Sequence, residues 1–202
     1  MTFRAVSAEA EPARDIPLAL PWVHAASEPY VDWLFGNHHA AARVLQRWMN
    51  RPSSEVFVGR AVLLLKESRP VGGFIALDGT ELAACRRHDA VAALASTSSE
   101  GRAALLSRLR VGRELLPEPP AGTLYLSRMG VLPHVRRRGY GKAILNEHLE
   151  RGKRQGFSRF SLDVWSANTA AIALYTSAGF RLERRQHASA AGMTYERMGL
   201  EA

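Results

Sequence analysis

A short basic segment with two glycines, set between a strand and a helix, constrains the fold of this chain more than any other feature. A strand is predicted over Leu124 to Val131, and a helix from about Tyr140 to Gln155. The turn that joins them consists of Arg136, Arg137, Arg138, Gly139, Tyr140, Gly141 and Lys142. The strand and helix that follow this helix continue the alternation, so the order of elements predicts an α/β or α+β domain.

This basic segment has the chemistry of a phosphate site. The start of a helix leaves backbone N–H groups without intrahelical partners, and the helix dipole adds about half a positive charge there. Gly139 and Gly141 lack side chains that would block a phosphate from those groups. Taken alone, the segment is equally compatible with a solvated basic helix start. It matches neither a dinucleotide fingerprint nor a P-loop, because Ile144 replaces the third glycine and Ala143 replaces the magnesium-binding hydroxyl.

A second segment downstream narrows the choice. Phe157 to Trp165 is predicted to be a strand, and Thr169 to Ala178 a helix capped by Asn168. The segment contains the pattern Leu162-Asp163-Val164-x-x-x-Asn168-x-x-Ala171-Ile172-x-Leu174-Tyr175-x-x-x-Gly179-Phe180. The turn before it contains Val131-x-Pro133-x-x-Arg136-x-x-Gly139-x-Gly141.

Together these two patterns resemble the acetyl-CoA signature of the GNAT (GCN5-related) N-acetyltransferase superfamily. The resemblance spans about Leu124 to Phe180, and its details are similar to those of ribosomal-protein alanine N-acetyltransferases. It implies a mixed, mostly antiparallel central sheet with a V-shaped splay between two neighbouring strands, flanked by helices. It also implies acetyl-CoA as the cosubstrate and an amine as the acceptor.

The resemblance assigns roles to individual residues. Main-chain groups of Met129, Gly130 and Val131 would bind the pantetheine arm, and amides from Arg137 through Lys142, after Arg136, would bind the pyrophosphate. Asn168 would contact the cofactor near its pantetheine, and Tyr175 would lie beside the thioester sulfur. A phenol with a normal pKa of about 10 suits proton donation to the departing CoA thiolate.

Asp163 is the candidate general base, because the ribosomal-protein acetylases carry an acidic residue at this position. An amine attacks a thioester only when it is neutral, and an aspartate accepts its proton directly or through water. The predicted alternation of the strand puts Asp163 with Ser161 and Trp165 on its polar side. A salt-bridged or solvent-facing aspartate is the alternative interpretation.

The remaining sequence predicts one domain over residues 1–202, with a helical insertion at about 79–122. Three prolines, at positions 12, 17 and 21, predict an extended or irregular start. Further predicted elements are two helices over Pro29 to Arg51 with a break at Gly36-Asn37, a hairpin of Ala61 to Leu65 with Val71 to Leu77, insertion helices at Asp89 to Leu94 and Arg102 to Leu116, and last strands at Phe180 to Glu183 and Met193 to Leu200.

Composition excludes several classes of protein. The net charge of +8 would suit nucleic acid, but its main cluster coincides with the phosphate segment, so no nucleic-acid partner is expected. A single cysteine, Cys85, rules out an internal disulfide framework. The seven histidines show no metal-binding spacing, and no metal is expected. No apolar stretch approaches the roughly 20 residues that cross a bilayer. The expected location is the cytoplasm, without membrane association. The sequence does not decide between a monomer and a homodimer.

Three functional hypotheses follow. The first is an N-acetyltransferase that transfers the acetyl group directly to a primary amine of a small molecule. The second is a protein or peptide N-terminal acetyltransferase. The third is a non-catalytic acyl-CoA-sensing or nucleic-acid-binding module on the same scaffold. The insertion favours the first hypothesis, because extra elements close a peptide groove.

Overall fold

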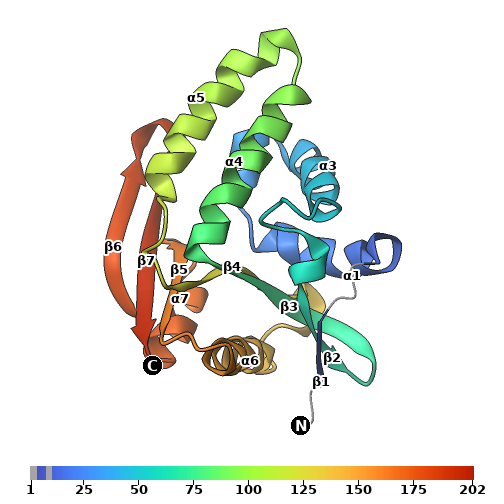
Figure 1. Cartoon of the computed structure of the whole chain (residues 1–202), viewed down its shortest axis with the longest axis vertical. Coiled ribbons are helices and arrows are strands. Elements are labelled where there is room, and N and C mark those ends of the chain that lie inside the picture. Colours follow the sequence, from blue (N-terminus) through green and yellow to red (C-terminus); the bar gives the residue numbers. More distant parts are fainter. Residues whose placement is uncertain (1–3, 8–10) are drawn as a thin grey trace.

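A seven-stranded mixed sheet forms the centre of the protein in the computed structural model, which describes residues 4–7 and 11–202 (Figure 1). The strand order is β1-β2-β3-β4-β5-β7-β6, and β4–β5 is a parallel pair whereas the other neighbours are antiparallel. The strands are β1 (Arg4–Ser7), β2 (Val62–Lys66), β3 (Arg69–Asp78), β4 (Leu124–Val131), β5 (Arg159–Trp165), β6 (Arg181–Ala188) and β7 (Met193–Glu201). This arrangement confirms the mixed, mostly antiparallel sheet that the resemblance implied.

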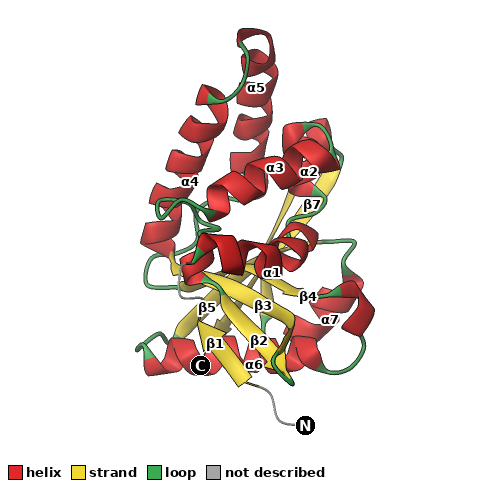
Figure 2. Ribbon diagram, turned by 90° about the vertical axis from the view of Figure 1, so that its right-hand side faces the viewer, coloured by secondary structure: helices red, strands yellow, loops and turns green. Residues whose placement is uncertain are grey.

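Helices cover both faces of the sheet and extend beyond it. They are α1 (Pro12–Ala25), α2 (Tyr30–Phe35), α3 (His38–Met49), α4 (Gly79–Ala95), α5 (Ser99–Leu115), α6 (Tyr140–Arg154) and α7 (Thr169–Ser177). In Figure 1, α6 lies at one end of the molecule and the α4–α5 hairpin projects at the other. Figure 2 shows α1 and α6 on opposite sides of the central strands. No helix among the described residues is both long and apolar enough to cross a bilayer.

The two largest apolar cores lie on the two faces of the sheet, and a third, smaller cluster joins α5 to β6 and β7. The core on the α6 side takes alternate residues of β5, namely Phe160, Leu162 and Val164, and packs them against Ile144 and Leu145 of α6. The other core joins β3 to the first helices, and it contains Trp22, Val23, Leu45, Met49, Ile75 and Leu77. The period-two alternation predicted for β5 is therefore confirmed, because its other residues face away from α6.

The expected irregular start is wrong, because residues 12–25 form helix α1. Pro12 stands in the first turn, where a helix does not need the missing N–H. Pro17 and Pro21 are four residues apart and exposed, so they share the solvent side of the helix. The opposite side buries residues such as Ala19 and Trp22. Burial of that side outweighs the two backbone hydrogen bonds that the inner prolines remove.

The other predicted elements are confirmed, with changes in length. Gly36 ends α2 in a left-handed conformation, and the Asn37 side chain caps α3 by accepting a hydrogen bond from the Ala40 amide. The segment between β3 and β4 folds as a helical hairpin. Its first helix begins at Gly79, ten residues earlier than expected, because the Asp78 side chain accepts from the Thr80 amide and caps it.

Candidate active site

A V-shaped gap opens between β4 and β5. Among the described residues, the two strands pair only at Leu124 with Phe160 and at Tyr125 with Ser161. Beyond these pairs, β4 continues to Val131 and β5 to Trp165 without further pairing between them. The gap therefore begins where Ser127 and Asp163 follow the last pair.

The β4 side of this gap carries the main-chain groups of Met129, Gly130 and Val131. On their other side these residues pair with β3, opposite Phe74, Gly73 and Gly72 respectively. A register shift makes Ser127 an extra residue on β4, and such a bulge increases the local twist. A β-carbon at Gly130 would lie only 2.7 Å from the Trp22 carbonyl oxygen, so a glycine is needed for α1 to approach this strand.

The basic segment forms a tight turn between β4 and α6. Arg137 and Gly139 have positive φ angles of 61° and 80°, a combination that turns successive N–H groups toward a common concave side. The Arg136 side chain folds back and donates from Nε to the Val131 carbonyl at 3.1 Å. The side chains of Arg137, Arg138 and Lys142 are exposed, whereas Tyr140 is buried against the sheet.

Gly141 serves a different purpose from Gly139. A β-carbon at Gly141 would lie 3.2 Å from Cδ2 of Leu174, so this glycine permits α7 to pack closely against the start of α6. A β-carbon at Gly139 would meet nothing within 4 Å, so the space beside it is open. The turn therefore offers a phosphate both positive charge and an unobstructed approach.

Asn168 and Tyr175 lie at the two ends of α7. The Asn168 side-chain oxygen accepts from the Ala171 amide and caps the helix, which confirms the predicted cap. Tyr175 is buried, with 8% of its surface exposed, in the core against which Met129 and Val131 pack. Burial raises the pKa of its phenol to about 12, so the group is a proton donor at neutral pH.

Asp163 is held in a buried ion pair. It lies opposite Arg197 of β7, which donates from Nη2 to Oδ2 at 2.6 Å and from Nε to Oδ1 at 3.1 Å. The Tyr125 hydroxyl donates to the same Oδ2 at 2.9 Å. The Asp163 side chain is 1% exposed. Because both carboxylate oxygens already accept hydrogen bonds, the geometry favours the salt-bridged interpretation, and the base role stays a prediction.

A chain of buried charges extends from this ion pair across the face of the sheet opposite α6. Arg86 donates to the Tyr125 hydroxyl at 3.2 Å and to Oε2 of Glu55 at 2.9 Å. Arg128 donates to Oε1 of Glu55 at 2.7 Å and to the Ser27 hydroxyl at 2.7 Å. Burial alone would raise the pKa of Glu55, but the two arginines outweigh it and hold this pKa below its usual value.

This charge chain could not be predicted from the sequence. Its members come from α1–α2, the segment before β2, α4, β4, β5 and β7, and no local pattern relates them. A cavity of about 720 Å³ lies beside it between α4 and α5, with Tyr30, Glu55 and Arg86 among its lining residues. Asp89 also lines this cavity, and burial raises the pKa of its carboxyl to about 7.

Solved structures share this fold across their whole length. An N-acetyltransferase from Staphylococcus aureus matches with a TM-score of 0.70 and 16% identity, covering 98% of this chain and 100% of its own. The ribosomal-protein-S18-alanine N-acetyltransferase from Escherichia coli matches with 0.54 and 15%, covering 99% and 94%. The PaiA N-acetyltransferase from Thermoplasma acidophilum, solved with coenzyme A, matches with 0.57 and 12%, covering 100% of both chains.

The sequence comparisons give the family. No curated protein sequence matches the chain significantly. The family model described as acetyltransferase (GNAT) family matches residues 22–180, which include the gap, the basic turn and α7. The chain therefore belongs to the GNAT family of acetyltransferases, which use acetyl-CoA as the acetyl donor.

Proposed function

We propose that this enzyme transfers the acetyl group directly from acetyl-CoA to a primary amine of a small molecule, within one domain of residues 1–202. The cavity between α4 and α5 is the observation that supports a small-molecule acceptor. Its volume of about 720 Å³ is in the range of sites that enclose small ligands. The hairpin that forms it is the predicted insertion at about 79–122, and it covers the charge chain beside the gap.

The proposed chemistry uses few side chains. The neutral amine attacks the thioester carbonyl, the C–S bond breaks, and the CoA thiolate takes a proton from the Tyr175 hydroxyl. The proton that the amine has lost restores the phenol. Met129, Gly130 and Val131 bind the pantetheine arm, and Asn168 contacts the cofactor nearby. The turn from Arg136 to Lys142 binds the pyrophosphate.

The environment of Asp163 supports a positioning role for this residue. Its carboxylate fixes Tyr125 and Arg197, and Arg197 in turn donates to the carbonyls of Pro117 and Glu118 at 2.5 and 2.9 Å. Asp163 thus anchors the end of the helical hairpin to the sheet. A base role through a bound water remains the competing proposal.

A turnover screen tests the acceptor class. Thiol release from acetyl-CoA is measured with amines, amino acids, polyamines, aminoglycosides and N-terminal peptides. We expect release with a small amine and not with peptides. Release with peptides alone would establish the N-terminal acetyltransferase alternative, and acetyl-CoA binding without turnover on any acceptor would favour a sensing module.

A cavity-filling substitution tests where the acceptor binds. Ala90 lines the cavity, so Ala90→Trp should raise the KM for the amine on the order of tenfold while the KM for acetyl-CoA is unchanged. Ala95→Trp is the matched control, because Ala95 is exposed at the end of the same helix. Equal amine KM values in the two variants would place the acceptor outside this cavity.

A further inference from the structure

Four side chains with metal-binding atoms converge where α1, α2 and α3 meet. They are His24 in the last turn of α1, Glu28 in the next loop, Asp32 in α2 and His38, the first residue of α3. One candidate ligand atom from each residue lies within 4.8 Å of the other three. The four residues come from separate elements, so their spacing in the sequence does not indicate a metal site.

The separations between these atoms suit one shared ion. His24 Nε2 is 2.8 Å from Oδ1 of Asp32, and His38 Nδ1 is 3.3 Å from Oδ2 of Asp32 and 3.4 Å from Oε1 of Glu28. Bonds of about 2.0–2.1 Å to a tetrahedral zinc ion put neighbouring ligand atoms about 3.3 Å apart. The two imidazole rings are stacked with centroids 4.1 Å apart, so the exposed His38 ring must rotate for its in-plane lone pair to point at an ion that His24 also binds.

The donor set also selects the ion. Imidazole nitrogen with carboxylate oxygen is a combination that suits Zn²⁺, whereas calcium and magnesium prefer oxygen ligands alone. Two ionised carboxylates and two neutral imidazoles together carry two negative charges, which a divalent ion neutralises. From this geometry and chemistry we propose that His24, Glu28, Asp32 and His38 form a zinc-binding site.

The candidate ligands differ in burial, so one side of the site is open to solvent and the other side is enclosed. The His24 side chain is 8% exposed, whereas that of His38 is 60% exposed. An ion therefore enters from solvent without disturbing the core and reaches an inner ligand that is already held in place by Asp32. Ser27, in the same loop as Glu28, accepts a hydrogen bond from Arg128 of β4. Zinc would thus fix the three helices at a corner that contacts the edge of the gap.

Metal titration of the untagged, chelator-treated protein tests this proposal. Calorimetry with Zn²⁺ should give one ion per chain, and Co²⁺ should give the visible absorption of a four-coordinate site. Asp32→Asn should weaken Zn²⁺ binding on the order of 100-fold, because Asp32 contacts both histidines. His38→Ala should weaken it on the order of tenfold and, being at an exposed position, should leave the fold intact.

His39→Ala is the matched control, since His39 is exposed and adjacent to His38 but outside the cluster. It should bind Zn²⁺ like the parent protein. Zinc should also raise the Tm of the parent and of His39→Ala, and should raise that of His38→Ala by clearly less at the same Zn²⁺ concentration. Absence of uptake by the parent, or equal affinity in His38→Ala and His39→Ala, would overturn the proposal. Neither result bears on acetyl transfer, which is measured separately.

Discussion

The two faces of the sheet support the proposed donor site and the proposed acceptor site by different means. On the α6 face, an apolar core supports β4, β5 and α7, and the proposed donor site consists of backbone groups within one stretch of sequence. On the opposite face, a chain of buried charges connects residues as far apart in the sequence as Ser27 and Arg128. The proposed donor half is therefore supported by apolar packing of residues close in sequence, whereas the proposed acceptor half is supported by ion pairs between residues distant in sequence.

This difference predicts different responses to substitution. Removing one partner of a buried ion pair leaves an uncompensated charge, which costs about 3–5 kcal/mol. A change in the phosphate turn alters an exposed surface and affects ligand binding more than folding.

Asp163→Asn should produce the largest effect, because it leaves the Arg197 guanidinium buried without its carboxylate. The free energy of unfolding should fall by about 3–5 kcal/mol, as measured by urea denaturation. If Asp163 is also the general base, turnover of the protein that stays folded should be lost as well.

A double substitution separates these two roles of Asp163. Arg197→Gln added to Asp163→Asn replaces the ion pair with a neutral pair, which should recover part of the lost stability. Under the positioning role, turnover should recover with stability. Arg197→Gln alone is the control, because it also removes the contacts to the carbonyls of Pro117 and Glu118. A double variant that is stable but much less active than this control would establish Asp163 as the base.

Gly139→Leu should weaken acetyl-CoA binding at least on the order of 100-fold, or about 2.7 kcal/mol, as measured by calorimetry. The new side chain would occupy the open space that the phosphate needs. Gly156→Leu is a close control, because Gly156 is also exposed, has a positive φ of 88°, and has nothing within 4 Å of its β-carbon position. Equal losses in both variants would show that backbone strain, and not phosphate access, is responsible.

Tyr175→Phe should lower kcat on the order of 100-fold with little change in the KM for acetyl-CoA, since it removes a proton donor and keeps the packed ring. The ring contact with Phe180, at 5.9 Å between centroids, does not depend on the hydroxyl. Steady-state kinetics measure the effect, and an unchanged kcat would remove Tyr175 from the chemistry.

The contrast between the two halves also explains what the sequence could predict. The strand, turn and helix of the donor site depend on residues close in sequence, and the Asn168 cap and the boundaries of β4 were therefore predicted correctly. The splay of β4 and β5 followed from family resemblance alone. The ion pair of Asp163 could not be predicted, because its partner Arg197 lies on β7. No local pattern in the sequence places β7 beside β5.

Helix α1 shows a second limit. Its prolines predict irregular structure when considered alone, and burial of one side of the helix, including Trp22 against Gly130, gives it its stability. The cluster of His24, Glu28, Asp32 and His38 is not predictable from the sequence for the same reason. Its candidate ligands converge only after α1, α2 and α3 have packed together. Residues that act through tertiary packing are thus the ones that sequence patterns do not place.

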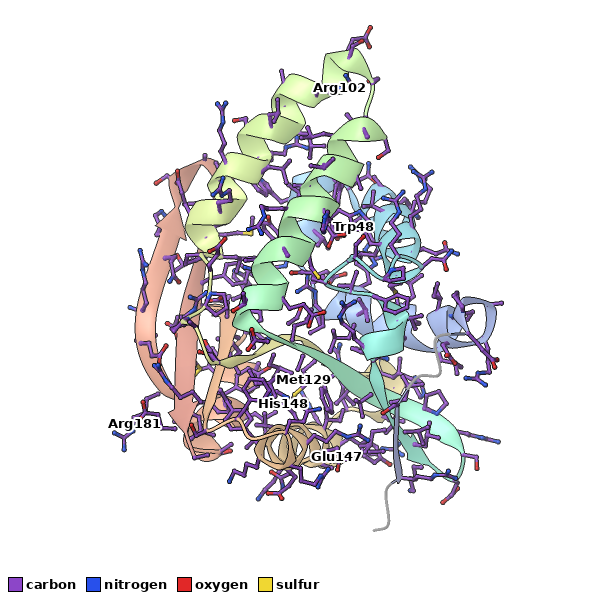
Figure 3. All side chains as sticks on the ribbon, in the orientation of Figure 1. Trp48, Arg102, Met129, Glu147, His148 and Arg181 are labelled. Carbon is purple, nitrogen blue, oxygen red and sulfur yellow. The ribbon has the colours of Figure 1, made fainter. Side chains whose placement is uncertain are left out.

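Substitution of His148 should have the smallest effect of this series. It tests whether the core that supports the donor half is apolar. His148 lies on α6 below β4 (Figure 3), fully buried between Phe74 and Phe160, and neither ring nitrogen has a hydrogen-bond partner among the described residues. Burial lowers its pKa from 6.5 to about 3. Above pH 6.5 the ring is neutral in both states. As the pH falls from 6.5 toward 3, the unfolded chain takes up a proton that the folded chain does not, so stability is lost at about 1.4 kcal/mol per pH unit.

His148→Leu should remove this pH dependence. Relative to the variant, the parent protein should lose about 2 kcal/mol of unfolding free energy between pH 7 and pH 5, measured by urea denaturation at both values. His88→Leu, at an exposed position of α4, should follow the parent. Carboxyl groups that titrate over the same range are common to all three proteins and cancel in the comparison. If the free energy of unfolding depended on pH in the same way in the parent and in His148→Leu, the core beside α6 would accept a charged histidine. The contrast between an apolar donor half and an ionic acceptor half would then be wrong.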